Sequence, residues 1–92
     1  MEFLVRIDVA LPGEMPAEQR DALADAERAY GAELRRRGTI VRIWRLPGGL
    51  RNVGVWQAAD ATELHAAIAG LPMYPWIRSE VTALACHPLE QG

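Results

Sequence analysis

The fold is decided by residues 39–57, which read TIVRIWRLPGGLRNVGVWQ. Residues 39–46 and 51–57 are rich in β-branched and aromatic side chains, which favour strands. The Pro-Gly-Gly sequence at 47–49 lies between them and is typical of a tight turn. The stretch therefore predicts a β-hairpin.

On the amino-terminal side, the sequence predicts a strand followed by a long helix. Residues 2–9, EFLVRIDV, alternate apolar and polar side chains, as in a strand with one buried face. From Pro16 to about Arg37 the chain is rich in Ala, Glu, Arg and Leu, and it ends in three arginines. Gly38 follows directly, and cations before a glycine indicate a helix C-terminus.

On the carboxyl-terminal side, a short helix and a last strand are expected. Asp60 stands three residues before Glu63, as in a capping box, and apolar residues then recur at helical spacing up to Leu71. Pro72 ends this helix, and residues 77–85, IRSEVTALA, read as a strand. The element order is therefore β-α-β-β-α-β.

This order predicts an α+β, ferredoxin-like fold, in which a four-stranded antiparallel sheet carries both helices on one face. We expect residues 1–92 to form one domain, with 86–92 as a C-terminal tail. Two helices leave the second face of the sheet uncovered, and the hairpin supplies Trp44 and Trp56. An exposed aromatic sheet face marks an interface, so we expect the face that bears one of these tryptophans to be buried in a homo-oligomer.

Composition narrows the function classes. The 92 residues contain ten Lys+Arg and twelve Asp+Glu, a net charge of −2 that argues against a nucleic-acid partner. No apolar run approaches the ~20 residues that span a bilayer, and the charged start MEFLVRID is unlike a signal peptide, so we expect a cytoplasmic protein without membrane contact. Cys86, His65 and His87 show no metal-ligand spacing, so no metal is expected.

One charged residue of the first helix does not fit its surroundings. On a helical wheel Glu27 lies about 40° from Leu23, inside the apolar stripe that also contains Tyr30 and Leu34. A carboxylate in an apolar stripe is desolvated, which raises its pKa toward values useful for proton transfer. The alternative is that Glu27 turns toward solvent or pairs with a core arginine, and the wheel gives both interpretations similar weight.

Arg45 and Asn52 are candidate partners of a substrate. Arg45 shares a strand face with Thr39, Val41 and Ile43. If that face looks toward the helices, its guanidinium can bind a substrate carboxylate bidentately or pair with Glu27. Asn52 can donate and accept beside it, although an asparagine after a turn more often bonds the local backbone.

The remaining candidate substrate contacts are aromatic or histidine side chains, each with a simpler alternative. Aromatic residues flanked by prolines more often close the end of a core than wall a pocket. His65 reads as a helix-surface residue, and an inward role for His87 requires a neighbouring subunit. The set comprises Tyr30, Trp44, His65, Tyr74, Trp76 and His87.

The chain resembles the muconolactone δ-isomerase family over almost its whole length. The residues that carry the resemblance are Leu11-Pro12, Glu27, Gly38-Thr39, Trp44-Arg45, Gly48, Asn52, Leu64-His65, Leu71-Pro72-x-x-Pro75 and His87-Pro88. The resemblance implies a ferredoxin-like subunit that assembles into dimers and a ring-like decamer, without a cofactor. It also implies a proton shift in a small unsaturated lactone carboxylate of aromatic compound catabolism, with Glu27 as the acid/base.

The sequence departs from the family pattern near that glutamate and around the hairpin. Ala24 replaces the lysine that the family has three residues before the glutamate. Gly49-Leu50 replace larger polar or aromatic side chains that we expect from the family pattern. Gly54 replaces an expected serine, and Arg78 replaces an expected acidic residue. The cationic partner of Glu27 is therefore absent.

Two classes of function compete. The first is a cofactor-independent isomerase in which Glu27 moves a proton while Arg45 and Asn52 hold a carboxylate or enolate. Its substrate is muconolactone or, given Ala24, another enolisable carboxylate isomerised or cyclised in secondary metabolism. The second is a non-catalytic, ligand-binding ferredoxin-like oligomer in which Glu27 pairs with Arg45.

Overall fold

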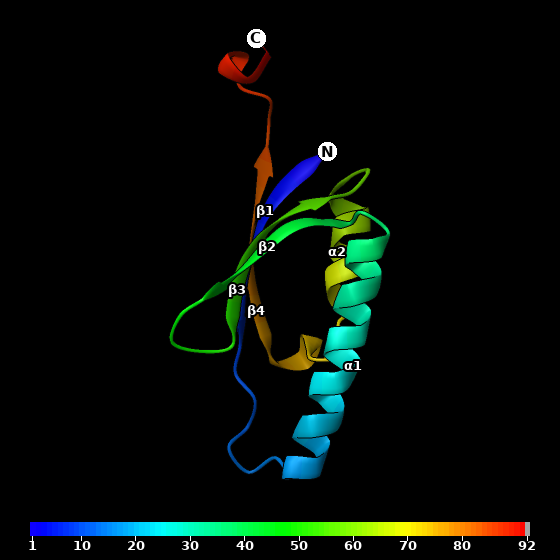
Figure 1. Cartoon of the computed structure of the whole chain (residues 1–92), viewed down its shortest axis with the longest axis vertical. Helices are drawn as coiled ribbons and strands as arrows, with labels where there is room; N and C mark the ends of the chain where they lie inside the picture. Colours follow the sequence, from blue (N-terminus) through cyan, green and yellow to red (C-terminus); the bar gives the residue numbers. More distant parts are fainter. Residues whose placement is uncertain (92) are drawn as a thin grey trace.

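The elements follow one another in the expected order and build one antiparallel sheet with both helices on the same side (Figure 1). The computed structural model describes residues 1–91. The elements are β1 (Glu2–Val9), α1 (Ala17–Arg36), β2 (Ile40–Leu46), β3 (Arg51–Gln57), α2 (Ala61–Ala69) and β4 (Ile77–Leu84), with 3-10 turns at Tyr74–Trp76 and Pro88–Gln91. The ferredoxin-like prediction is confirmed.

The strand order β2-β3-β1-β4 places β1 and β3 in the centre and β2 at an edge. Phe3, Val5 and Ile7 of β1 are buried, and Phe3 pairs with Trp56 of β3. Residues directly opposite each other share a face, so Trp56 points toward the helices. Trp44 of β2 pairs with Val53 and lies on the other face of the sheet. Of the two tryptophans, Trp44 is therefore the one on the face that the helices leave open.

A bulge in β2 alters the face assignments along that strand. The pairing passes from Ile40 opposite Trp56 to Arg42 opposite Val55, so Val41 is an extra residue. Arg45 consequently shares the helix-facing side with Ile40 and Ile43. The shared side of Arg45 and Ile43 agrees with simple alternation, whereas Ile40 joins that side only because of the extra residue.

The predicted helix-ending signals are present in the structure. Gly38 has φ 81°, and its N–H donates to the Arg35 carbonyl while the Thr39 N–H donates to the Leu34 carbonyl. These two bonds form a Schellman motif, which needs a left-handed residue that glycine supplies without strain. At the start of α2 the Asp60 carboxylate accepts from the Glu63 N–H at 2.8 Å, as the capping-box spacing predicted.

The core fills the layer between the sheet and the helices. Its most completely buried large side chains are Trp56, Phe3, Leu34, Leu64 and Val5. The Tyr30 hydroxyl donates to the Ala67 carbonyl at 2.9 Å and so ties α1 to α2.

The C-terminal residues leave the end of β4 and extend away from the rest of the subunit (Figure 1). This segment contributes to principal extents of 52 × 25 × 20 Å. Within residues 1–91, no helix has the length and apolar character needed to cross a membrane.

Candidate active site

A cavity of about 390 Å³ lies between the sheet and helix α1. The sheet contributes the floor, α1 the facing wall, and the loop after α2 one end. The lining residues are Ile7, Val9, Ile40, Ile43, Arg45, Leu50, Asn52 and Trp56 from the sheet and hairpin, Ala24, Glu27, Arg28 and Gly31 from α1, and Leu71 and Met73 from the loop. The wall is thus mostly apolar with a few polar groups, which is the usual character of a small-molecule site.

Glu27 is the carboxylate of this cavity. Its Oε1 accepts a hydrogen bond from the backbone N–H of Met73 at 3.0 Å, which fixes the side chain between α1 and the loop. Burial raises the pKa of Glu27 above its ordinary value, and the Met73 hydrogen bond offsets part of that increase. The sequence-based prediction of a desolvated carboxylate with a raised pKa agrees with this environment.

Small residues of α1 leave room beside Glu27. Ala24 lies one turn before it and Gly31 one turn after it, and both line the cavity. A Cβ atom at Gly31 would meet no atom within 4 Å, so the helix faces open space there. The short side chain of Ala24 therefore leaves space in the cavity, and a lysine at this position would place a cation beside Glu27.

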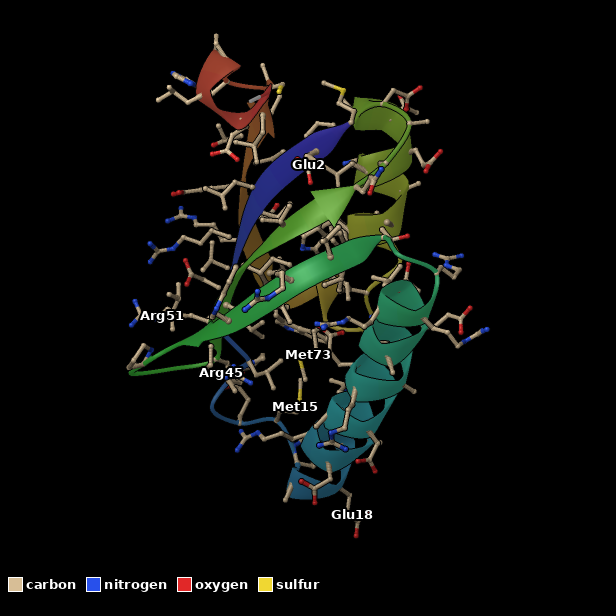
Figure 2. All side chains as sticks on the ribbon, turned by 45° about the horizontal axis from the view of Figure 1, so that its top comes forward. Glu2, Met15, Glu18, Arg45, Arg51 and Met73 are labelled. Atoms are coloured by element: carbon tan, nitrogen blue, oxygen red, sulfur yellow. The ribbon has the colours of Figure 1, made fainter. Side chains whose placement is uncertain are left out.

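Arg45 lies on the side of the sheet that faces α1, as does Met73, whereas Arg51 projects from the opposite side (Figure 2). Arg45 lines the cavity and is exposed to solvent. In the part of the chain that the structure describes, no ion pair joins Arg45 to Glu27. Arg28, also on the cavity wall, pairs with Asp25 at 3.1 Å on the helix surface.

Two polar atoms on the cavity floor have no hydrogen-bond partner. Asn52 Oδ1 and Trp56 Nε1 are both buried from solvent and unsatisfied among the described residues. Buried donors and acceptors are normally paired, so each such atom calls for an explanation. Both atoms belong to residues that line the cavity.

The structure separates Tyr30 and Trp44 from the cavity that contains Glu27. Tyr30 is occupied by its bond to Ala67 and lines a different hollow with Thr39. Trp44 is 46% exposed on the open sheet face, where the Arg42 guanidinium lies 4.9 Å from its ring centroid. Neither residue contacts the Glu27 cavity of its own subunit.

The other predicted aromatic and histidine contacts also lie outside it. His65 and Tyr74 pack edge to face on the surface, with ring centroids 6.5 Å apart. Trp76 lines a separate surface depression beside residues 48–51. His87 is exposed in the extended C-terminal segment, where its Nδ1 accepts from the Leu89 N–H. For all these residues a role at the site stays a prediction, and for His87 it requires a partner subunit.

Sequence reasoning did not select Trp56 or the Met73 N–H for the site. The signal for Trp56 was available, because it stands four residues after Asn52 in a strand and so shares its face. No local signal identifies the Met73 N–H, since it meets a side chain 46 positions away in the chain. Across residues 1–91 no group of three or more His, Cys, Asp or Glu side chains is arranged to hold a metal ion.

The fold and this cavity define a small ferredoxin-like domain that carries a half-buried carboxylate in a mostly apolar pocket. The family model described as muconolactone delta-isomerase matches residues 1–90. The muconolactone delta-isomerase of Acinetobacter baylyi is 42% identical over 96% of this chain and 92% of its own, and that of Cupriavidus pinatubonensis is 39% identical over 96% of each. The chain therefore belongs to the muconolactone delta-isomerase family.

Solved structures agree with this assignment. A crystal structure of muconolactone isomerase superposes with a TM-score of 0.89 at 32% identity, covering 96% of this chain and 92% of that one. A 5-chloro-2-hydroxyhydroquinone dehydrochlorinase from Burkholderia phenoliruptrix superposes with a TM-score of 0.70 at 18% identity, over 92% and 94% of the two chains. The second likeness shows a shared fold alone. The protein is accordingly an intramolecular isomerase by family.

Proposed function

We propose that this protein isomerises muconolactone by moving one proton with Glu27. The observation that carries the proposal is the position of Glu27, half-buried in the cavity, with its Oε1 fixed by Met73 and its pKa raised by burial. A carboxylate with a raised pKa is a stronger base than an ordinary glutamate, and a larger fraction of it is protonated at a given pH, so the same group can serve first as base and then as acid.

The reaction needs one base and one stabilised enolate. Glu27 removes the proton from the ring carbon γ to the lactone carbonyl, and the C–H electron pair extends the conjugation so that negative charge develops on the carbonyl oxygen. Glu27 then returns the proton to the carbon α to the carbonyl, which leaves the double bond shifted by one position. Atoms and electrons balance without a further reactant, so we propose that no cofactor is used.

Arg45 and Asn52 are the proposed groups that hold the substrate. The Arg45 guanidinium lines the cavity at its exposed side and can bind the substrate carboxylate where this enters from solvent. Asn52 lies on the neighbouring strand directly opposite Arg45. This arrangement directs the carboxylate toward the exposed edge and the lactone ring toward Glu27.

Ala24 favours a second candidate within the same class. Because Ala24 lines the cavity next to Glu27, the site is larger and less cationic there than one with a lysine. A related isomerisation or cyclisation of another enolisable carboxylate in secondary metabolism would use the same Glu27 chemistry. Comparing initial rates for muconolactone and for larger unsaturated lactone acids distinguishes the two substrates.

The open sheet face supports a homo-oligomer built from dimers. Its apolar part consists of Leu4, Trp44, Val53 and Val55, which the register places on the side away from the helices. A second copy of the same face is the partner that we propose for this surface. A ring-like decamer as the full assembly and the cytoplasm as its location complete the proposal.

The experiment is a comparison of Glu27→Gln with wild type on muconolactone. Glutamine keeps the size of the side chain and can still accept from Met73, but it cannot shuttle a proton, so turnover should fall by roughly 10²–10⁴-fold. Wild-type kcat/KM should decline as pH falls through the raised pKa of Glu27, because the base must be ionised.

Glu33→Gln is the matched control, since Glu33 lies on the same helix and pairs with Arg36 on the surface. It should keep wild-type activity. Near wild-type turnover by Glu27→Gln would favour the remaining alternative, a non-catalytic ligand-binding oligomer.

A further inference from the structure

The indole of Trp56 is unusual among the buried side chains of the sheet. Trp56 is 1% exposed, yet its Nε1–H donates to no atom of the described residues. An indole has one donor and no acceptor, and a buried tryptophan usually finds a partner for it. Trp56 Nε1–H is therefore a buried donor without an acceptor among the described residues.

The register places Trp56 on the side of the sheet that forms the cavity floor. Trp56, Gly54 and Asn52 follow one another on the helix-facing side of β3, opposite Phe3, Val5 and Ile7 of β1. Gly54 has no side chain, so the strand carries nothing between the Trp56 ring and the Asn52 amide on that face. Glu27 approaches the same cavity from α1, on the wall opposite the sheet.

Base and donor thus face a ligand from opposite sides. A flat ring placed between the sheet and α1 presents its carbon atoms to Glu27 and its edge to the polar atoms of the floor. Arg45 lies at the exposed side of the cavity and attracts the carboxylate there. The lactone carbonyl, at the other side of the ring, is then directed toward the buried part of the floor.

We propose that Trp56 is a catalytic residue whose Nε1–H donates to the lactone carbonyl oxygen of the substrate. This inference rests on the proposed function and deepens it. The indole keeps its proton throughout, while Glu27 carries the migrating one. A donor fixed in a water-poor site gains most when charge develops on the acceptor, so the bond stabilises the enolate more than the ground-state lactone.

The decisive variant removes the N–H and nothing else. Replacing Trp56 by β-(3-benzothienyl)alanine keeps both fused rings and substitutes sulfur for the N–H, and Trp56→Phe provides a genetically encoded version. Both should lower kcat by roughly 10²–10³-fold, the usual effect of losing one donor to an oxyanion, with KM within a few-fold of wild type.

Ile68→Val is the control for loss of buried volume, because Ile68 is in the core and does not line the cavity. It should keep wild-type kcat. Wild-type kcat in the benzothienyl variant would overturn the role of Trp56 while leaving the proposed function intact.

A binding measurement separates the failure of this inference from the failure of the proposed function. The probe is the saturated γ-lactone that carries the same carboxymethyl group and cannot isomerise. In protein labelled with ¹⁵N, the chain has three tryptophan indole signals, and the one missing in Trp56→Phe belongs to Trp56. The probe should move that signal downfield and slow its exchange with water.

The outcomes are distinct. An inactive wild type whose Trp56 signal still responds to the probe refutes the isomerase function and retains the lactone-binding donor. An active wild type whose Trp56 signal ignores the bound probe refutes the donor alone. Neither turnover nor binding of the probe refutes both.

Discussion

Gly54 offers a sharp test of how β2 is held against the cavity floor. A Cβ atom at this position would lie 2.6 Å from the Arg42 carbonyl oxygen and 3.4 Å from Ile43 Cα. Both neighbours are backbone atoms of β2 next to the bulge, so they cannot move aside as a flexible side chain would. Gly54→Ala and Gly54→Ser therefore force β2 away from β3.

The magnitude follows from two opposing terms. Inserting an atom into a filled space costs about 1–3 kcal/mol, whereas replacing a strand glycine recovers about 0.5–1 kcal/mol of unfolded-state entropy. The midpoints of the two ranges give a net destabilisation of about 1.25 kcal/mol, and for a domain of this size each kcal/mol lowers Tm by about 4–8 °C. We expect Tm to fall by about 5–10 °C. Activity should also fall, because Ile43 and Arg45 line the cavity and move with β2.

Thermal unfolding followed by circular dichroism measures the effect, and Gly31→Ala is the matched control. A Cβ at Gly31 meets nothing within 4 Å, and alanine is favoured over glycine in a helix by about 0.8–1 kcal/mol, so this variant should melt higher. A Gly54→Ala protein with the wild-type Tm would refute the reasoning, since it would show that the bulge yields without cost.

Two further predictions concern the charge beside Glu27 and the open sheet face. Wild-type activity on muconolactone should be weak at neutral pH, and Ala24→Lys should raise it and shift the acidic limb of the pH–rate profile to lower pH, because a neighbouring ammonium lowers the pKa of Glu27. Initial rates on muconolactone from pH 5 to 9 test this prediction. Ala26→Lys is the control, because it adds the same charge at an exposed position outside the cavity. Strong wild-type activity would show that a lysine at position 24 is dispensable. Light scattering at micromolar concentration should show an oligomer for the wild type and a smaller species for Trp44→Glu, whose charge falls in the apolar part of the open face; a monomeric wild type contradicts the interface.

The local part of the fold followed from the sequence because local chemistry encodes it. Asp60 caps α2 through the Glu63 N–H, and Gly38 ends α1 in a left-handed conformation, as the residue types at those spacings predicted. The alternation of β1 identified its buried face correctly. Each of these features depends on residues a few positions apart, so hydrophobic periodicity and capping signals suffice to predict it.

Of the site residues predicted from the sequence, Glu27, Arg45 and Asn52 line the cavity. The helical wheel identified Glu27 because a carboxylate within an apolar stripe can be recognised from the sequence, without knowledge of the elements that pack against that helix. The aromatic and histidine side chains were chosen by type, and the structure places Tyr74, Trp76 and His65 outside the Glu27 cavity. Residue type indicates what a side chain can do, whereas the cavity that it faces depends on the packing of distant elements.

By itself, the sequence determined the order of the elements, the ends of both helices and the place of Glu27 among apolar residues. Only the tertiary structure decided that Trp56 faces the cavity and Trp44 the open sheet face, that a bulge turns Arg45 toward α1, and that Glu27 accepts from Met73 rather than pairing with Arg45. The physical reason is that the periodicity of apolar side chains and the capping signals depend only on residues a few positions apart in the sequence. Strand register, bulges and contacts between α1 and the loop after α2 are set by which distant surfaces bury one another best, and that is a property of the assembled fold.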